Sequence, residues 1–384
     1  MRIVQSVCGV FWQFDLAREM ESRGYLTRIY STFPWPRLKR EGVPRERIRS
    51  FPWIHTPQIA AGRYVRIPRQ LGWEWSYLNF KMFDSWVARR IEDCDALVSL
   101  SGTGLKSGRT VQQRGGRYVC DRGSSHMRYQ NTIVNEEYAR WGFQVQSCDP
   151  RMIEREEAEY AQADAIFVPS EFARRSFIEM GVPAAKVKTI PYGVRLERFR
   201  PTKERSKESF EVLFAGTVSL RKGIPYLLEA FRKLRHPHKR LRLAGPVEPA
   251  VATLLSRQIL DGIEVLGRMP QPRLAEYMSR SHVLVLPSIE DGFGLVMAQA
   301  MACGAVVVSS ENTGGPDLYA DGIEGFVIPI RDSEALSRRL QQLADDPELR
   351  LRMSEASLHR VAQHGGWHDY GERCANHLRE LTGA

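Results

Sequence analysis

Short apolar runs alternate with helix-length amphipathic segments along the chain, a pattern typical of strand–helix units on a parallel sheet. The pattern is clearest in the second half, which predicts strands over Glu211–Gly216, Arg240–Gly245, Ile263–Gly267, His282–Pro287, Ala305–Ser309 and Gly325–Pro329. Between them it predicts helices over Ile224–Arg235, Ala250–Leu260, Pro272–Arg280, Leu295–Cys303 and Ser333–Leu343. Six strands with intervening helices indicate one doubly wound domain.

The first half begins in the same way, with a strand over Arg2–Cys8, a turn at Gly9 and a helix over Phe11–Arg23. Later strands are predicted over Ala96–Leu100, Arg117–Cys120, Ala165–Pro169 and Lys186–Pro191. From about Tyr30 to Trp75 the pattern is irregular and rich in proline, arginine and aromatic residues, which predicts an insertion or a loop-rich surface.

The polar, charged segment 196–209 indicates a linker between two domains. We therefore predict an α/β protein with one Rossmann-like domain over residues 1–195, a second over residues 210–365, and a last helix within residues 366–384. Two such sheets leave a cleft between the carboxyl ends of their strands, where ligands of doubly wound sheets bind.

Composition adds a charge asymmetry to this picture. The 384 residues include 55 Lys and Arg against 45 Asp and Glu, a formal net charge of +10. Residues 1–200 hold 32 of the basic and 22 of the acidic residues, so the whole excess lies in the first half and suggests an anionic partner there. The 43% of hydrophobic residues is enough to bury a core, which excludes general disorder.

Several features predict a reduced, cytoplasmic protein. No apolar run reaches about 18 residues, so no transmembrane helix is expected. The N-terminus does not resemble a secretion signal, and the six scattered cysteines argue against a metal cluster or a disulfide framework.

The segment Leu286–Val308 carries the most informative motif. A strand ends before the acidic pair Glu290-Asp291, and Gly292-Phe293-Gly294 then opens a helix. Glycines at a helix start let a ligand approach the backbone, and the free N–H groups there favour an anion. A carboxylate beside such a site fits a ligand with both phosphate and hydroxyl groups, such as a phosphorylated sugar. The plain alternative is an acidic loop followed by a helix cap.

A second strand end, within Phe214–Gly223, carries Gly216 and the adjacent cations Arg221 and Lys222. Such a loop can hold a diphosphate by charge-assisted hydrogen bonds, although a solvated turn before a helix has the same residues. Three further strand ends of this domain are also marked by glycine, which makes a purely structural explanation less convincing.

Together these segments resemble the retaining, nucleotide-sugar-dependent glycosyltransferases of family 4, or group 1 glycosyltransferases. The resemblance is strongest over Ala161–Asp346 and rests on ADAIFVPSEFARRSFIEMGVPAAKVKTIPYGV, FAGTVSLRKGIPYLLEAF and PSIEDGFGLVMAQAMACG, in this order and spacing. It implies the GT-B fold, in which two Rossmann-like domains face each other and a terminal helix crosses back to the first. It also implies a nucleotide sugar as co-substrate, no cofactor and usually no metal ion.

The resemblance gives roles to individual residues of this chain. Lys222 matches the lysine that binds the donor diphosphate, and Thr217 replaces an arginine of the family, so Arg221 is the candidate for the missing charge. The other donor-binding candidates are Gly9 and Gly216 in glycine loops, Arg268 and Met269 beside the base, and Gly292, Phe293, Gly294 and Leu295 beside the phosphate and sugar.

The family signature of two glutamates separated by seven residues is altered here to Asp291 and Gln299. The first position contacts the transferred sugar, so Asp291 and the adjacent Glu290 are candidate catalytic residues. The second position binds the ribose hydroxyls, which Gln299 can do by accepting and donating hydrogen bonds. We interpret the change as tuning of an enzyme, with weakened or lost activity as the alternative.

A histidine of the first domain often lies near the anomeric carbon in this family. His126, which follows the strand ending at Cys120 and enters a helix, is the candidate catalytic residue here. The alternative is a histidine at a helix start, with Ser124 or Ser125 as the cap.

Basic and aromatic residues are interleaved within residues 34–90. They are Arg37, Lys39, Arg40, Arg45, Arg47, Arg49, Arg63, Arg66 and Arg69, with Trp35, Phe51, Trp53, Tyr64, Trp73 and Trp75. This mixture suits the headgroup region of an anionic membrane and predicts peripheral association with the inner face. A solvated basic face is the alternative, and nucleic-acid binding ranks lower because no nucleic-acid module accompanies the pattern.

The sequence thus predicts a retaining hexosyltransferase that moves a sugar from a nucleotide diphosphate sugar to a hydroxyl of a glycan, lipid-linked or other acceptor. Uridine is the commoner base in the family and guanosine the alternative. A nucleotide-sugar epimerase of the same fold, and a non-catalytic protein that binds nucleotide sugar or a membrane surface, are the competing hypotheses.

Overall fold

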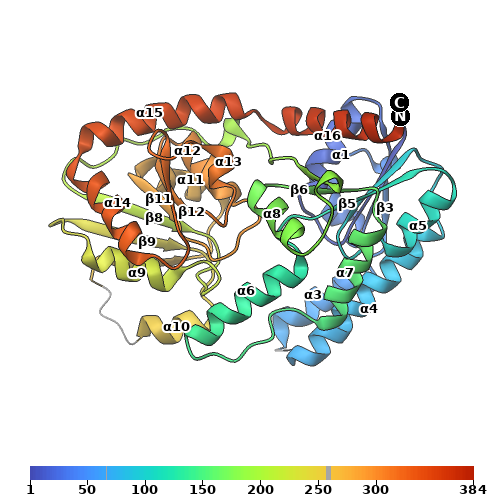
Figure 1. The fold of residues 1–384 in the computed structure, drawn as a ribbon, viewed down its shortest axis with the longest axis horizontal. Helices are drawn as coiled ribbons and strands as arrows, with labels where there is room; N and C mark the ends of the chain where they lie inside the picture. The colour runs from blue at the N-terminus through green and yellow to red at the C-terminus, as the bar shows by residue number, and fades with distance from the viewer. Residues whose placement is uncertain (66, 257–260) are drawn as a thin grey trace.

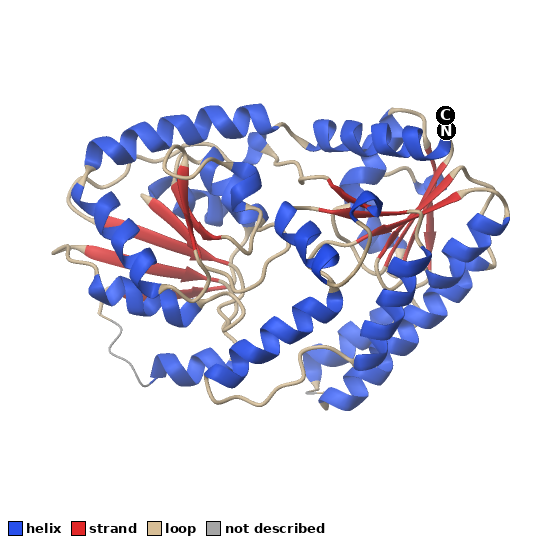
Figure 2. Cartoon of the chain, in the orientation of Figure 1, coloured by secondary structure: helices blue, strands red, loops and turns tan. Residues whose placement is uncertain are grey.

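Two parallel sheets, each with helices on both faces, form the molecule (Figures 1 and 2). The computed structural model describes residues 1–65, 67–256 and 261–384. The predicted α/β fold with two doubly wound domains is confirmed. Arg66, and the last four residues of the helix predicted over Ala250–Leu260, lie outside the described residues.

The first sheet has the strand order β3-β2-β1-β4-β5-β6-β7. Its strands are β1 Ile3–Val7, β2 Leu26–Ser31, β3 Ile48–Ser50, β4 Ala96–Leu100, β5 Arg117–Asp121, β6 Ala165–Val168 and β7 Val187–Thr189. The helices around it are α1 Gln13–Ser22, α2 Trp35–Leu38, α3 His55–Tyr64, α4 Arg69–Ala88, α5 Leu105–Gln113, α6 Met127–Arg140, α7 Pro150–Gln162 and α8 Glu171–Glu179. The chain reverses its winding direction between β1 and β4, which pair in parallel at the centre.

The second sheet repeats this arrangement with the order β10-β9-β8-β11-β12-β13. Its strands are β8 Phe210–Ala215, β9 Lys239–Ala244, β10 Ile263–Gly267, β11 Val283–Leu286, β12 Val306–Ser310 and β13 Gly325–Ile328. The helices are α9 Ile224–Lys233, α10 Pro249–Ser256, α11 Gln271–Arg280, α12 Leu295–Ala302, α13 Gly315–Leu318, α14 Ser333–Asp345, α15 Pro347–His364 and α16 Trp367–Thr382. β8 and β11 are wholly buried, as expected for the four apolar residues of β11 and for β8, in which Glu211 is the one charged residue.

The last two helices connect the domains. α15 packs against α12 in the second domain, and α16 packs against α1 in the first, so both termini lie side by side (Figure 1). A Cβ atom on Gly371 would lie 2.4 Å from Cβ of Glu19, so glycine is needed where α16 meets α1. The sequence pattern predicted α16 but did not predict α15.

The prediction of a loop-rich surface over residues 30–75 is wrong. This region contains the end of β2, the short helix α2, β3, α3 and the start of the 20-residue helix α4. The sequence pattern did not predict α4, because its apolar residues lie on several faces of the helix. Only a narrow stripe of four residues is buried: Asn79, Phe83, Asp84 and Val87.

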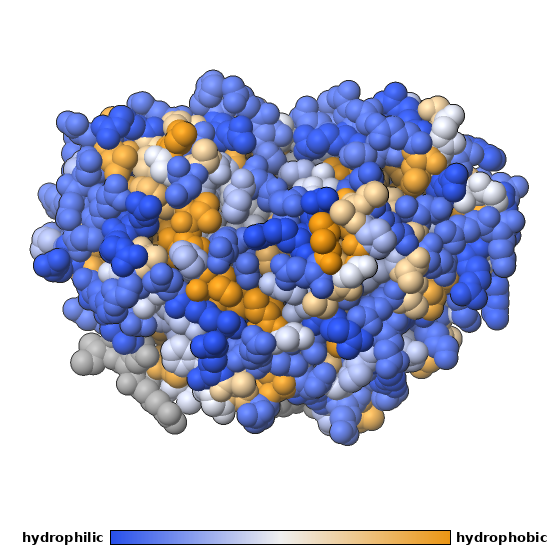
Figure 3. Space-filling model, in the orientation of Figure 1, coloured by the Kyte–Doolittle hydropathy of each residue, from blue (hydrophilic) through white to orange (hydrophobic). Residues whose placement is uncertain are grey.

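The face of the molecule seen in Figure 3 is mostly hydrophilic, with apolar side chains in small separate groups. Among the described residues, no helix combines the length and the apolar character needed to span a bilayer.

Candidate functional site

Lys222 and Asp291 meet where the two motif loops of the second domain come together. Lys222 lies just before α9 and Asp291 just before α12, and the Lys222 ammonium donates to Oδ2 of Asp291. Gly223 permits this approach, because a Cβ atom there would lie 1.9 Å from the carbonyl oxygen of Pro287. Burial lowers the pKa of Lys222, and the charge of Asp291 opposes that shift. The pair is a cation and a carboxylate held at the start of one helix.

Glu290 joins the two domains through a buried clasp. The side chain has no exposed surface, and Oε2 accepts from Arg221 at 2.8 Å and from Gln130 of α6 at 3.0 Å. Oε1 accepts from the hydroxyls of Ser124 at 2.6 Å and Ser125 at 2.8 Å. Burial alone would raise the pKa of Glu290, but Arg221 and these donors lower it to about 2. Glu290 therefore stays ionised and is turned toward the first domain.

Gly292 brings the backbones of the two domains into contact. A Cβ atom there would lie 2.2 Å from the carbonyl oxygen of Gly123 and 2.5 Å from Cα of Ser124. The Gly292 carbonyl accepts from the Ser170 hydroxyl of the first domain at 2.5 Å. Two residues later, Gly294 begins α12 with a φ of 78°, which L side chains rarely adopt. The cleft is thus closed at this point.

The side chain of Phe293 forms a further contact between the two domains. Its buried ring packs edge-to-face against Tyr192, with an interplanar angle of 72° and the centroids 5.4 Å apart, and Tyr192 in turn packs against Trp12 at 5.0 Å. The Phe293 side chain is therefore a structural contact between domains, which leaves its backbone as the part able to approach a ligand.

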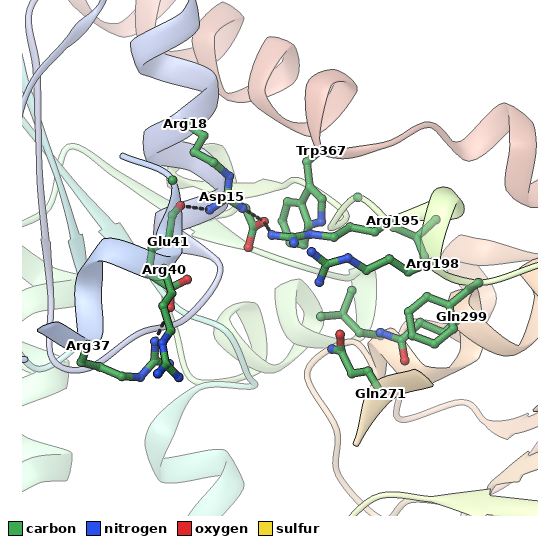
Figure 4. A pocket seen from close by; sticks show the side chains of 15 residues that line it. Asp15, Arg18, Arg37, Arg40, Glu41, Arg195, Arg198, Gln271, Gln299 and Trp367 are labelled. Atoms are coloured by element: carbon green, nitrogen blue, oxygen red, sulfur yellow. Dashed lines mark hydrogen bonds and ion pairs between the residues drawn. The ribbon is translucent and has the colours of Figure 1, made fainter. Parts of the chain in front are cut away.

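A pocket of about 650 Å³ opens beside this junction (Figure 4). The predicted donor-binding residues Leu295 and Gln299 line one wall. Arg195 reaches in from the end of the first domain and Arg198 from the linker, and further arginines come from α1 and from the segment that follows β2. We call this cavity the hinge pocket. Two of its arginines belong to the basic region that the sequence assigned to a membrane surface, namely Arg37 and Arg40.

The chain matches two family models, described as glycosyl transferases group 1 over residues 197–360 and glycosyltransferase family 4 over residues 13–198. The chain belongs to this glycosyltransferase family. It is 33% identical over 205 residues to a D-inositol 3-phosphate glycosyltransferase of Streptomyces avermitilis, a match that covers 47% of this chain and 44% of that protein. The chain thus spans about half the length of the curated relatives it matches.

Solved structures support the GT-B fold of this family member over its whole length. Sucrose-phosphate synthase from Thermosynechococcus elongatus has a TM-score of 0.72 and 20% identity, with 99% of both chains covered. HepE from Anabaena in complex with UDP has a TM-score of 0.72 and 15% identity, with 99% of this chain and all of that chain covered. At this identity the similarity establishes the fold alone.

His126 lies in the core of the first domain of this family member. Its ring packs against Tyr160 at 4.9 Å and Phe177 at 5.0 Å, and Nδ1 accepts from the backbone N–H of Arg128 as the cap of α6. Burial lowers the pKa of His126 to about 4. The placement matches the helix-start alternative, with the difference that His126 itself, and neither serine, is the cap.

The other predicted donor residues are spread around the carboxyl ends of the strands. Gly9, with a φ of 103°, follows β1 and donates its N–H to Thr32 at 2.9 Å. Gly216 and Thr217 follow β8, and Gly245 must be glycine because its Cβ atom would lie 1.8 Å from the Gly216 carbonyl oxygen. Arg268 and Met269 lie between β10 and α11, with Arg268 exposed and Met269 half-buried.

Asp121 is a residue that the sequence did not single out. It ends β5 and accepts from the side chains of Trp12 at 2.7 Å and Gln13 at 2.9 Å. Burial raises its pKa to about 7, although both donors oppose the shift. An acidic residue directly after an apolar strand was the signal that could have identified it.

Among the described residues, no group of His, Cys, Asp and Glu is arranged to hold a metal ion.

The clasp at Glu290 predicts a pH-dependent contribution to stability. A shift of the pKa from 4.5 to about 2 corresponds to about 3 kcal/mol. Because the folded pKa is the lower one, this stabilisation is present above pH 4.5 and is lost as the pH falls toward 2. Urea unfolding of Glu290→Gln should therefore show a loss of about 3 kcal/mol at pH 7 that shrinks below pH 4.5.

Glu334→Gln is the matched control, because Glu334 pairs with Lys233 on the exposed surface. It should change the unfolding free energy by less than about 1 kcal/mol. Equal effects of the two substitutions, or a Glu290→Gln effect that does not depend on pH, would contradict the clasp.

Proposed function

We propose that the chain transfers a glycosyl residue from a nucleotide diphosphate sugar to a hydroxyl group of an acceptor, with retention of the anomeric configuration. The observation that carries the proposal is the Lys222–Asp291 pair at the start of α12, in a cleft closed by contacts of Gly292 with the first domain. A diphosphate and a sugar hydroxyl are the groups that would separate such a pair, because the first attracts the ammonium and the second donates to the carboxylate.

In the proposed reaction the bond between the anomeric carbon and the phosphate oxygen breaks, and the acceptor oxygen bonds to the same face of that carbon. The acceptor proton passes to the departing phosphate oxygen. Lys222, Arg221 and the backbone N–H groups at the start of α12 stabilise the negative charge that develops on the diphosphate. Asp291 orients the sugar, and Glu290 acts as a positioning residue through the clasp. Because these groups stabilise the charge of the leaving diphosphate, we propose that no metal ion is needed. Transfer should therefore persist in the presence of EDTA.

Two relatives guide the choice of ligands for the first experiments. The structures of HepE from Anabaena contain UDP, UDP with glucose, or UDP-glucose. UDP-sugars are therefore the first donors to test, followed by GDP-sugars. The relative from Streptomyces avermitilis is named for a phosphorylated inositol acceptor, so small phosphorylated polyols belong in the acceptor panel.

A thermal-shift screen of nucleotide sugars tests the proposal, because a ligand that binds only the folded state raises the melting temperature by mass action. The bound donor is then incubated with and without acceptors. Donor consumption that needs an acceptor supports transfer, whereas conversion to an isomeric donor without acceptor supports the epimerase hypothesis. Binding without turnover across the acceptor panel supports a non-catalytic protein.

We further propose that the chain binds a membrane surface through an apolar groove between α3 and α4, and that it reaches its acceptor there. The groove has a volume of about 880 Å³ and is lined mainly by apolar side chains. Seven of the thirteen large apolar side chains that are exposed among the described residues lie between Trp53 and Met82. Lys81 lines the groove and forms no ion pair with a described residue. The side chain of Arg63, assigned to this surface, lies outside the described residues.

Leu71→Glu tests the membrane proposal, since Leu71 is 60% exposed and lines the groove. Loss of one apolar anchor and addition of a negative charge should weaken binding to vesicles of phosphatidylcholine and phosphatidylglycerol about tenfold. Leu351→Glu is the control, because Leu351 is equally exposed at 60% but lies on α15. Equal losses for both variants, or equal binding of the unaltered protein to vesicles without phosphatidylglycerol, would count against this surface.

A further inference from the structure

Asp121 is a buried carboxylate without a cationic partner. It is 2% exposed at the carboxyl end of β5, and it forms no ion pair with any residue in the described part of the chain. The neighbouring Arg122 pairs with Glu156 at 3.1 Å instead. Burial of a charge without a partner lowers the stability of a fold, and such groups are concentrated at functional sites.

Asp121 holds the side chain of Trp12 in place. Its Oδ2 atom accepts from Nε1 of Trp12 at 2.7 Å and from Nε2 of Gln13 at 2.9 Å. An indole N–H can only donate, so the contact fixes the orientation of the Trp12 ring. Because Trp12 follows Gly9 by three residues, Asp121 ties the loop between β1 and α1 to the end of β5.

The ring of Trp12 lies directly against the loop that meets the second domain. A Cβ atom on Gly123 would lie 2.0 Å from Cη2 of Trp12. The Gly123 carbonyl oxygen is the atom that a Cβ atom on Gly292 would meet, and the adjacent Ser124 donates to Glu290 at 2.6 Å. Trp12 thus lies between Asp121 and the first-domain loop that closes the cleft.

The titratable groups around Asp121 cannot neutralise its charge. Tyr192 lies before the linker, Tyr370 and Cys374 lie on α16, and Cys120 precedes Asp121 on β5. Each is an acid whose pKa is raised by burial, so all four are uncharged near pH 7. Burial also raises the pKa of Asp121, to about 7, so its charge changes in the neutral range.

Protonation changes the hydrogen bonds that Asp121 can form. A carboxylate only accepts, which matches the N–H groups of Trp12 and Gln13, whereas a neutral carboxyl group also has an O–H that needs an acceptor. Oε1 of Gln13 is buried and has no hydrogen-bond partner in the described structure, so it can accept this O–H once the amide turns. Charge-assisted hydrogen bonds therefore hold the loop between β1 and α1 only while Asp121 is ionised.

We propose that Asp121 is a positioning residue for sugar transfer, which acts through Trp12 to align the first-domain loops with the second domain. This inference rests on the proposed function, which places the reacting groups in the cleft that these loops close. The ionised form is the one that aligns the loops. The uncompensated charge of Asp121 is then retained for activity at the expense of stability.

Asp121→Asn in the full chain tests the inference, with a nucleotide sugar identified by thermal shift. Asparagine keeps an acceptor oxygen for Trp12 and Gln13 but carries no charge at any pH. At pH 8 the variant should transfer sugar about tenfold more slowly with an unchanged KM for the donor, because weaker hydrogen bonds loosen the alignment of the reacting groups. Below about pH 6 the two rates should converge, since Asp121 is then neutral in the unaltered chain as well.

The melting temperature of the same variant should change in the opposite direction to its activity. The folded pKa of Asp121 lies above its ordinary value of 3.8, so ionisation of Asp121 lowers the stability as the pH rises through about 7. Asp121→Asn should therefore melt about 5 °C higher than the unaltered chain at pH 8, with a smaller difference at pH 5. A residue with a merely structural role would lower the melting temperature and the rate together when it is replaced.

Trp12→Phe and Asp164→Asn complete the set of variants. Trp12→Phe keeps an aromatic ring beside Gly123 but removes the indole N–H. If Asp121 acts through Trp12, the double variant should be no slower than the slower single variant. Asp164→Asn is the matched control, because Asp164 also accepts from an amide side chain, that of Gln112 at 2.8 Å, but lies before β6 at the amino edge of the sheet. It should leave the rate and its pH dependence unchanged.

The NMR signal of the Trp12 indole N–H provides a readout that does not need sugar transfer, and its loss in Trp12→Phe assigns it. Its chemical shift should titrate near pH 7 in the unaltered chain and stay constant in Asp121→Asn. A signal that does not titrate overturns the inference whatever the activity. A signal that titrates in a chain that turns over no nucleotide sugar shows that the proposed function is wrong, and the positioning role falls with it.

The kinetic outcomes separate the inference from the proposed function. Convergence of the rates at low pH and equal rates of the double variant and the slower single variant support the positioning role. Parallel pH profiles of the unaltered chain and Asp121→Asn, or multiplied losses in the double variant, overturn it. Transfer is still observed in that case, so the proposed function stands.

Discussion

Lys222→Ala should lower the rate of sugar transfer about 100- to 1000-fold. In the proposed reaction its ammonium lies against the diphosphate as negative charge develops there, and the loss of one such group in a water-excluded site has this order of effect. Lys222 is one of the few charged residues that are buried, and its partner Asp291 would remain without its cation. Steady-state kinetics with a nucleotide sugar identified by thermal shift provides the measurement.

Lys233→Ala, at the end of the helix α9 that Lys222 precedes, is the control for a lysine substitution, since Lys233 pairs with Glu229 and Glu334 at the surface. Its kcat should match that of the unaltered chain. A Lys222→Ala variant that folds, as judged by its melting temperature, and transfers sugar at the normal rate would remove the phosphate assignment.

Gly292→Ala should lower kcat about 100-fold while the domains themselves stay folded. The new Cβ atom would lie 2.2 Å from the Gly123 carbonyl oxygen, and contacts shorter than 3.0 Å are not tolerated, so the domains must separate by roughly 0.8 Å or more at this point. A displacement of about 1 Å between reacting groups can cost a factor of about 100. Small-angle scattering should show a larger radius of gyration together with the loss of activity.

Gly62→Ala is the matched control, because no heavy atom lies within 4 Å of a Cβ atom at that position. It makes the same chemical change without a clash and should alter neither kcat nor the radius of gyration. Full activity of Gly292→Ala with an unchanged radius would show that close contact of the domains is not required.

The architecture could be predicted from the sequence where burial leaves a simple pattern. β8 and β11 are covered on both faces, so β11 is a continuous apolar run and β8 is one apart from Glu211, and Gly216 directly follows β8. α4 and α15 could not be predicted in the same way. Each buries a narrow stripe of side chains, so the apolar periodicity of its sequence is weak.

The sequence could predict those residues of the candidate site that belong to one short motif. It could not predict contacts between residues that are far apart in the chain. Lys222 and Asp291 belong to two compact motifs, and both are found at the strand ends where those motifs placed them. The clasp joins Glu290 to Ser124, 166 residues away, and no local pattern encodes such a contact. His126 shows a second kind of limit. The local sequence around a histidine at a helix start is the same whether the side chain faces a ligand or the core.

The charge asymmetry also changes its meaning in the folded molecule. The excess of basic residues in the first half suggested one anionic partner for one surface. In the structure Arg37 and Arg40 face the hinge pocket, whereas Lys81 lies at the groove between α3 and α4. The basic residues of this half are therefore divided between an internal pocket and an external face, which no count of charges can distinguish.

In the proposed function the cleft binds a nucleotide sugar and transfers its sugar to an acceptor. The most direct measurement is the release of nucleoside diphosphate from each bound nucleotide sugar, with and without the acceptor panel, accompanied by mass spectrometry of the acceptor. We expect release that rises with acceptor concentration, an acceptor heavier by one sugar residue, and the loss of both in Lys222→Ala. Donor turnover that is independent of every acceptor, or no binding of any nucleotide sugar, would contradict it.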